Sequence, residues 1–193
     1  IGDRFRAAGF QPTTFDLRRA IDFPAIRQLT RILRDFRADI VHSHEFTMAI
    51  YGAAAARRAG ARHVITMHGG LYYSLAWRRR VALRWAARRS DALVGVSAAT
   101  AGALRHHLGI GAARVHIIPN GIPLRTGSRD RLRRELSIAP GEPLIVAVGN
   151  LYMVKGHAVL IDALATLRDR GWRLAIAGRG EEEPRLRAQA AAA

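Results

Sequence analysis

Short apolar runs alternate with helix-like segments along the chain. The runs are rich in β-branched residues, which is typical of strands buried in a parallel sheet. Between them, apolar residues recur every three or four positions, as they do along a helix that packs one face on a sheet. We expect strands at residues 39–42, 63–67, 91–96, 114–118, 144–148 and 173–177. This alternation predicts an α/β fold of βαβ units with parallel sheets and right-handed crossovers.

Helices are expected between these strands, and their ends carry recognisable signals. They cover residues 21–36, 46–59, 71–89, 98–108 and 156–167, with a short helix at 129–136. Gly60 and Gly109 are placed to end two of them, and Ser97 to cap the start of another. In the helix that opens at Gly156, we expect one apolar face to pack on the sheet. Its residues are Val159, Leu160, Ala163, Leu164 and Leu167.

A polar segment rich in proline and glycine interrupts the alternation between Asn120 and Pro143. Such a segment is typical of a domain boundary. We therefore expect an N-terminal domain at residues 1–122, a linker at 123–142 and a second domain at 143–193. The sequence starts without methionine and stops inside an expected helix, so we interpret it as part of a longer protein, truncated at both ends.

The formal net charge of +16 comes from 31 lysines and arginines against 15 aspartates and glutamates. Such a charge is compatible with nucleic-acid binding. We favour a solvated excess and no nucleic-acid partner, because the arginines are spread over nearly all of the expected helices. The absence of cysteine excludes disulfides and thiolate metal sites, and no apolar run approaches the ~20 residues that span a bilayer. We therefore expect a cytoplasmic protein.

Lys155 is the only lysine of the chain and lies between an expected strand and an expected helix. Gly149 ends the strand, and a loop that starts at Asn150 leads to the helix. At this edge of a parallel sheet, the free N–H groups and the dipole of a helix amino terminus favour an anion. A compact ammonium at this point indicates a phosphate-binding role. A solvated loop lysine would give the same pattern.

Histidines gather at the ends of two expected strands. His42 and His44 lie at the end of the first strand, next to Glu45, and His68 follows the second strand directly. A His-x-His pair could be half of a zinc site. We favour histidines held by hydrogen bonds, because later strand ends supply no further ligands. Gly69 would let a ligand approach the backbone beside the imidazole of His68.

The helix expected at residues 71–89 has an unusual outer face. Arg80, Arg84 and Arg88 form a stripe at every fourth position, interleaved with Trp77 and Trp85. Tryptophan and arginine on one face suit a membrane interface, where indoles lie at headgroup level and guanidinium groups meet lipid phosphates. Tryptophans that pack on a neighbouring segment, beside solvated arginines, would explain the pattern equally well.

Six segments, taken in order, resemble the group 1 retaining glycosyltransferases of the family 4 type, which have the GT-B fold. They are residues 39–44, 64–69, 90–97, 115–121, 148–156 and 174–180. The most specific are the Ile-Pro-Asn-Gly sequence that ends at Gly121 and the Gly-x-Leu…Lys-Gly loop that ends at Gly156. The resemblance covers nearly the whole chain.

The resemblance implies two facing Rossmann-like domains with a nucleotide-sugar in the cleft between them. Lys155 would neutralise the donor diphosphate, and His68 would be the catalytic histidine that hydrogen-bonds to the transferred sugar. The other residues matched to the donor side are Gly149, Asn150, Gly178 and Gly180, and those on the acceptor side are His44, Glu45 and Gly69.

Three features depart from the family pattern. Asn150 stands where many members have an arginine, so part of the diphosphate charge must be met elsewhere or the donor is bound more weakly. The family's two glutamates, separated by seven residues, should lie well beyond Gly180, and residues 181–183 lack that spacing. The glycine-rich loop of the first strand is also missing. On this resemblance, the stretch by itself is expected to be inactive.

The expected function is transfer of a sugar from a UDP- or GDP-linked donor, with retention, to a lipid-linked or polysaccharide acceptor of cell-envelope biosynthesis. We place this activity at the inner face of the cytoplasmic membrane. No metal or other cofactor is expected, because cationic side chains and helix dipoles can stabilise the leaving diphosphate. The alternatives are a nucleotide-sugar epimerase of the same fold and a non-catalytic nucleotide- or nucleic-acid-binding module.

Overall fold

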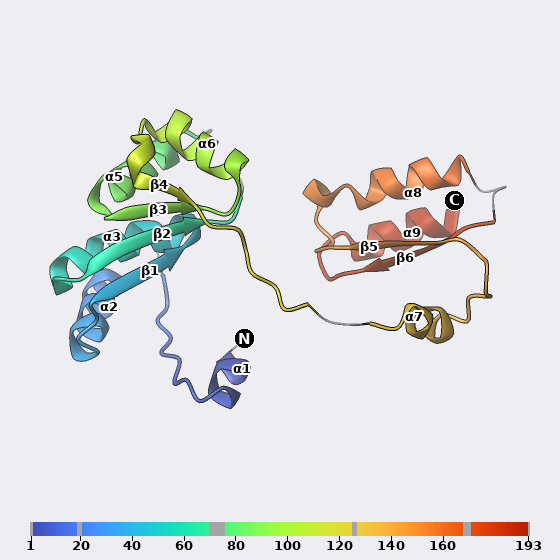
Figure 1. The fold of residues 1–193 in the computed structure, drawn as a ribbon, viewed down its shortest axis with the longest axis horizontal. Coiled ribbons are helices and arrows are strands. Elements are labelled where there is room, and N and C mark those ends of the chain that lie inside the picture. Colours follow the sequence, from blue (N-terminus) through green and yellow to red (C-terminus); the bar gives the residue numbers. More distant parts are fainter. Residues whose placement is uncertain (1, 19–20, 70–75, 125–126, 168–170, 193) are drawn as a thin grey trace. The chain divides into compact units, whose positions relative to one another are not determined.

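The computed structural model describes residues 2–18, 21–69, 76–124, 127–167 and 171–192 (Figure 1). The chain divides into two compact units between Ile122 and Pro123, which we call unit 1 and unit 2. Residues 123–142, interpreted from the sequence as a linker, group with unit 2. Each unit contains its own parallel sheet.

In unit 1 the described residues form a sheet of four parallel strands, in the order β1-β2-β3-β4. The strands are β1 (Ile40–His44), β2 (Arg62–Met67), β3 (Ala92–Gly95) and β4 (Val115–Ile117). The helices are α1 (Gly2–Ala7), α2 (Phe23–Asp35), α3 (Glu45–Ala59), α5 (Trp77–Arg89) and α6 (Ala98–Leu108), and η1 (Ala112–Arg114) is a 3-10 turn. The predicted α/β alternation and parallel sheet are confirmed.

Local sequence signals set the helix ends of unit 1. Ser97 caps α6 as predicted, because its Oγ accepts the N–H of Thr100 at 3.1 Å. Gly60 and Gly109 end α3 and α6 with φ angles of 80° and 59°, left-handed values that favour glycine. Helix α1 was not expected, because its six residues carry no apolar stripe. In the structure none of them is buried. The predicted start of α5 at Leu71 lies outside the described residues.

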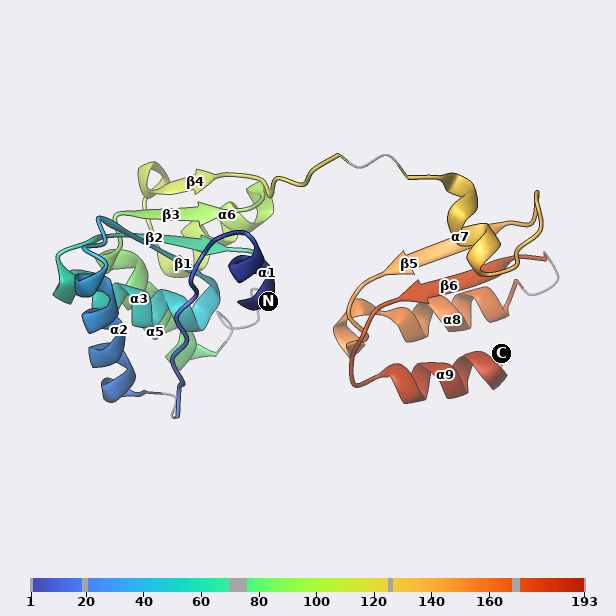
Figure 2. The same ribbon diagram turned by 90° about the horizontal axis from the view of Figure 1, so that it is seen from below.

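Small residues on α3 let this helix approach the sheet closely. Ala49 and Ala53 are buried in the core of unit 1, together with side chains of β2, β3, α5 and α6. Between them, a Cβ on Gly52 would overlap Oγ of Ser43 and lie 2.6 Å from Nε2 of His63. Helices α3 and α5 lie on the same side of the sheet (Figure 2), so this core occupies one face of it.

Unit 2 contains the parallel strands β5 (Leu144–Val148) and β6 (Arg173–Ala177), both with the predicted bounds. Its helices in the described chain are α7 (Arg129–Glu135), α8 (His157–Ala165) and α9 (Glu183–Ala192), and η2 (Met153–Lys155) is a 3-10 turn. Helices α8 and α9 lie together on one side of the two strands (Figure 2). Leu151, Ile161 and Leu186 form the centre of a small core there.

Two predictions about the packing of unit 2 are wrong in part. The apolar run of β5 indicated a strand covered on both faces, but among the described elements α8 and α9 share a side, and Val146 and Val148 remain 47% and 80% exposed on the other. Leu164 of the predicted apolar face of α8 is buried, but the other buried residues are His157 and Ile161, and Val159 is 71% exposed. Apolar residues lie on all sides of α8, so the sequence pattern did not reveal which face of the helix is buried.

Candidate functional site

The carboxyl ends of β1 and β2 bring the histidines of unit 1 together. His44 is the last residue of β1 and is paired in register with Thr66 of β2. His68 follows the end of β2 at Met67. His44 and His68 therefore leave neighbouring strands at the same edge of the sheet, where parallel α/β folds bind ligands.

Three imidazole rings form a contiguous group at this edge. Nδ1 of His44 lies 2.7 Å from Nε2 of His68, and the two rings meet edge to edge, with centroids 5.0 Å apart and planes inclined by 22°. The centroid of the His42 ring lies 4.3 Å from that of His44. Nε2 of His42 is 2.7 Å from Oγ1 of Thr66. His42 and His44 are therefore both hydrogen-bonded at strand ends, as we favoured from the sequence.

Glu45, the first residue of α3, is hydrogen-bonded to the backbone of His68. Its Oε1 accepts the N–H of His68 at 3.1 Å. Glu45 has a φ of 65°, a left-handed value that is uncommon for a residue with a side chain. Gly69 has a φ of 148°, and a Cβ there would meet no atom within 4 Å. At Gly69 the backbone conformation, and not lack of space, is therefore what favours glycine.

The environment of the histidines favours the neutral form of His44. Partial burial lowers the pKa of His44, and the neighbouring His42 and His68 lower it further, while Glu45 raises it. A neutral imidazole has one donor and one acceptor nitrogen, which the 2.7 Å contact with His68 requires. Within the described ranges, no group of three or more His, Asp or Glu residues is arranged to hold a metal ion.

Behind these histidines, on the other face of the sheet, lies a buried polar chain that the sequence did not lead us to expect. His63 is 2% exposed; its Nε2 lies 2.8 Å from Oγ of Ser43, and its Nδ1 lies 2.7 Å from Oγ of Ser90. Burial lowers the pKa of His63 to about 4, although the nearby Asp91 opposes this. The alternation of side chains along a strand could have revealed these buried hydrogen bonds. Ser43 lies between His42 and His44 in sequence, so it must point to the opposite face of the sheet, toward the helices.

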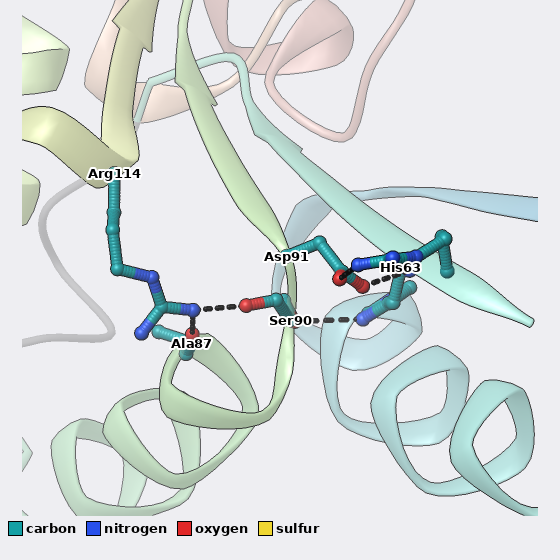
Figure 3. Close-up of polar contacts among 6 residues, drawn as sticks. His63, Ala87, Ser90, Asp91 and Arg114 are labelled. Atoms are coloured by element: carbon teal, nitrogen blue, oxygen red, sulfur yellow. Dashed lines mark hydrogen bonds and ion pairs between the residues drawn. The ribbon is translucent and has the colours of Figure 1, made fainter.

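Figure 3 shows how this chain continues to the end of α5. The backbone N–H of His63 donates to Oδ2 of Asp91 at 2.9 Å. The guanidinium of Arg62 pairs with Oδ1 of the same carboxylate at 2.7 Å. The guanidinium of Arg114 donates to the carbonyl oxygens of Ala87 and Ser90. The loop from α5 to β3 is therefore held to β2 on one side and to the start of β4 on the other.

In unit 2, Lys155 lies where β5 leads into α8. It is the last residue of η2, and Gly156 follows with a φ of 70° as the residue that precedes α8. The Lys155 side chain is exposed. Its ammonium makes no hydrogen bond or ion pair with the part of the chain that the structure describes. The structure thus places a free cation at the carboxyl end of β5 and the amino terminus of α8.

The two glycine turns of unit 2 fit closely against each other. A Cβ on Gly178 would overlap the carbonyl oxygen of Gly149, and a Cβ on Gly180 would overlap that of Leu151. The N–H of Leu151 donates to the carbonyl oxygen of Arg179 at 2.9 Å, and Gly149 makes a similar bond with the end of β6. Backbone packing alone therefore requires glycine at 178 and 180.

Asn150 lies between these contacts at the end of β5. Its carbonyl oxygen accepts a hydrogen bond from Nε2 of His157, at 3.2 Å, which ties the loop to the first residue of α8. The same imidazole lies 3.5 Å from where a Cβ of Gly149 would be. The loop before Lys155 is thus held by both β6 and α8.

On α5, the predicted outer face is confirmed for most but not all of its residues. Arg80, Arg84 and Arg88 are exposed, and Trp77 is 64% exposed. The placement of Trp85 on this face is wrong: it is half-buried against the core, and the guanidinium of Arg89 lies 4.6 Å from its ring. Its neighbours in sequence, Ala86 and Ala87, are fully buried, which turns the indole toward the sheet. Among the described helices, none combines the length and the apolar character needed to cross a bilayer.

Two family models together match almost the entire sequence. Residues 2–126 match the model of Glycosyltransferase Family 4, and residues 128–193 match that of Glycosyl transferases group 1. The change from one model to the other falls close to the division between unit 1 and unit 2.

Curated relatives are about 30% identical to this chain over the aligned segments. The chain is 30% identical over 146 residues to the alpha-maltose-1-phosphate synthase of Mycolicibacterium smegmatis, a match that covers 65% of this chain and 37% of that protein. It is 29% identical over 158 residues to the D-inositol 3-phosphate glycosyltransferase of Pseudarthrobacter chlorophenolicus, which covers 75% and 38% respectively. The chain therefore spans less than half the length of these relatives.

Solved structures show the same fold. The crystal structure of HepE from Anabaena in complex with UDP and glucose matches 98% of this chain and 55% of its own, with a TM-score of 0.81 and 20% identity. A glycosyltransferase from Rickettsia africae matches 97% and 52%, with a TM-score of 0.71 and 16% identity. These likenesses establish an α/β fold of the GT-B type.

Proposed function

The chain belongs to glycosyltransferase family 4, and we propose that the protein transfers a sugar from a UDP- or GDP-linked donor to an acceptor hydroxyl with retention of configuration. The observation that carries this proposal is Lys155, a cation free of partners in the described chain, at the mouth of α8. The HepE structure that this fold resembles contains UDP and glucose. That likeness supports a nucleotide-sugar as the donor.

The chemistry of a nucleotide-sugar explains why one cation at this point matters. Cleavage of the bond between sugar and diphosphate leaves negative charge on the departing phosphate oxygens. An ammonium and the amino terminus of a helix stabilise that charge in place, without a metal ion. The loop that holds Lys155 is tied to β6 and to α8, so its position is set before the donor arrives. Gly178 and Gly180 border this loop and would lie beside the nucleotide.

Asn150 limits how tightly the donor is held in this proposal. Its side chain is neutral, so it donates a hydrogen bond to a phosphate oxygen but adds no charge. Charge-assisted hydrogen bonds are roughly twice as strong as neutral ones. Lys155 would then supply most of the electrostatic attraction in this loop.

His68 of unit 1 is the proposed catalytic residue beside the transferred sugar. It lies at the carboxyl edge of the sheet, held by His44 and Glu45, and is followed by Gly69, which has no side chain. A hydrogen bond from a sugar hydroxyl to an imidazole orients the sugar while the bond to the diphosphate breaks. His44, Glu45 and Gly69 then form the acceptor side of the site.

For the acceptor, we propose a lipid-linked or polysaccharide substrate at the cytoplasmic face of a membrane, in the synthesis of cell-envelope polysaccharide. The exposed face of α5, formed by Trp77, Arg80, Arg84 and Arg88, supports contact with anionic lipid. A small phosphorylated acceptor is the competing candidate. It is favoured by the name of the D-inositol 3-phosphate glycosyltransferase to which the chain is similar.

The experiment that tests the donor site is calorimetric titration of UDP, GDP and UDP-glucose into the chain and into two variants. Lys155→Ala removes the proposed phosphate cation. Arg131→Ala is the matched control, because it removes one exposed cation from α7 of the same unit. We expect Lys155→Ala to weaken binding by about tenfold or more, as loss of a charge-assisted hydrogen bond does, and Arg131→Ala to leave it unchanged. Absence of binding to the folded chain, or equal affinities in all three proteins, would overturn the proposal.

A further inference from the structure

The contact between His44 and His68 leaves only one ring nitrogen of His68 for a ligand. Nε2 of His68 is occupied by Nδ1 of His44 at 2.7 Å. Its backbone N–H is occupied by Glu45. Nδ1 of His68 makes no hydrogen bond with the described residues. What this nitrogen offers to a ligand, a proton or a lone pair, depends on the direction of the hydrogen bond between the two rings.

The tautomers of the two histidines decide that direction. His44 is neutral near pH 7, because burial and its two histidine neighbours lower its pKa. A free neutral imidazole side chain is more stable with its proton on Nε2 than on Nδ1. If His68 donates from Nε2–H to Nδ1 of His44, both rings keep this stable form. The opposite direction would force both rings into the less stable form, so the geometry favours His68 as the donor.

We propose that His44 is a positioning residue that accepts the Nε2–H of His68 and thereby keeps Nδ1 of His68 as a hydrogen-bond acceptor for a hydroxyl of the bound sugar. This inference rests on the proposed function, because it assigns a sugar to the space beside His68. The edge-to-edge contact with His44, whose ring plane is inclined by 22° to that of His68, also sets the orientation of the His68 imidazole. An unprotonated ring nitrogen accepts a hydrogen bond, so it recognises a hydroxyl donor. An ionised carboxylate or phosphate oxygen has no proton to donate and would be repelled by the lone pair of this nitrogen.

His42 provides the matched control for this role. The centroid of its ring lies 4.3 Å from that of His44, closer than the 5.0 Å between His44 and His68. Its Nε2, however, is bonded to Thr66 and not to His68. Replacing His42 with phenylalanine keeps an aromatic ring beside His44, removes the hydrogen bond to Thr66 and leaves the hydrogen bond between His44 and His68 in place.

The test is nuclear magnetic resonance of the histidine side chains in the ¹⁵N-labelled chain, without ligand, at about pH 8, where histidines are neutral. We expect His68 to be protonated at Nε2 only. His44→Asn should retain this form, because the asparagine Oδ1 takes the place of Nδ1 as an acceptor. His44→Phe should lose it and give a mixture of tautomers, because phenylalanine keeps an aromatic ring at this position but cannot accept a hydrogen bond. His42→Phe should leave the His68 signals unchanged.

Each outcome of this experiment either supports or overturns the inference. A wild-type His68 protonated at Nδ1, or an unchanged His68 spectrum in His44→Phe, would overturn it. The second stage adds UDP-glucose to the wild-type chain, and we expect the Nδ1 resonance of His68 to shift. Binding of UDP-glucose with no such shift would also overturn the inference while the proposed function stands. If UDP-glucose does not bind at all, the proposed function fails, and the ligand-free spectra still decide the role of His44.

Discussion

Nδ1 of His63 donates its proton to Oγ of Ser90, and this bond fixes the tautomer of the most deeply buried histidine in the described chain. The direction follows from the hydroxyl of Ser90, which donates its own proton to the carbonyl oxygen of Ala86 at 2.8 Å. Nε2 of His63 must therefore accept the hydroxyl proton of Ser43. A single neutral ring thus joins β1, β2 and the end of α5.

The first prediction concerns the stability of unit 1 in acid. The pKa of His63 falls from 6.5 to about 4 in the folded protein, so the unfolded chain takes up this proton more readily. The contribution to the free energy of unfolding is fully present above pH 6.5 and is lost as the pH falls toward 4, by about 3 kcal/mol in total. Urea unfolding followed by tryptophan fluorescence at several pH values measures this loss.

The control for this measurement is His63→Asn, which removes the titrating ring. Carboxylates also titrate toward the acid end of this range, so the informative quantity is the difference in slope between the two proteins just below pH 6.5. The variant should be less stable at neutral pH and should lose less stability on acidification. Identical slopes would show that His63 is not the group responsible.

The second prediction concerns the hydroxyl of Ser90. Ser90→Ala leaves the Nδ1–H of His63 without an acceptor in the core, which should lower the free energy of unfolding by about 1–3 kcal/mol. Thr47→Ala removes an exposed hydroxyl from α3 of the same unit and should change it by less than about 0.5 kcal/mol. Chemical denaturation of both variants measures the difference, and a Ser90→Ala protein as stable as the control would contradict the assigned bond.

The third prediction compares two helical glycines. At Gly52 of α3, a methyl group would overlap Ser43 and press on His63, so Gly52→Ala should destabilise unit 1 by about 1–3 kcal/mol. At Gly102 of α6, a Cβ would meet nothing within 4 Å. Gly102→Ala should therefore stabilise the helix by about 0.5–1 kcal/mol. The two midpoints of thermal unfolding should move in opposite directions, and a shift of both in the same direction would count against this packing of α3.

The sequence revealed those parts of the fold that depend on local pattern. Strands β5 and β6 have the predicted bounds, and Ser97 caps α6 as expected, because apolar runs and capping side chains act over a few residues. It did not reveal the buried face of α8, where Ile161 and not Val159 packs on the sheet. Every face of that helix carries apolar residues, so the choice depends on tertiary contacts with α9.

The candidate site was predictable to a similar degree. His44 and His68 could be placed at one sheet edge, because the ends of parallel strands meet there. Their direct hydrogen bond could not be predicted, since it depends on the register that pairs β1 with β2. The roles of Ser43 and His63 were missed for a related reason: a hydroxyl and an imidazole in apolar strands carry no signal until the strands are aligned.

The last prediction tests the exposed face of α5 against lipid. Arg80, Arg84 and Arg88 share this face with Trp77, and each basic residue near an anionic membrane contributes about 1 kcal/mol. The triple variant with glutamate at 80, 84 and 88 should therefore no longer sediment with vesicles of phosphatidylserine and phosphatidylcholine. The control carries glutamate at Arg27, Arg31 and Arg57, which are exposed on α2 and α3, and has the same net charge. If net charge alone drove sedimentation, both variants would lose it. A specific contact through α5 requires that only the first variant loses sedimentation with the vesicles. It also requires that Trp77→Ala, introduced into the wild-type chain, decreases sedimentation.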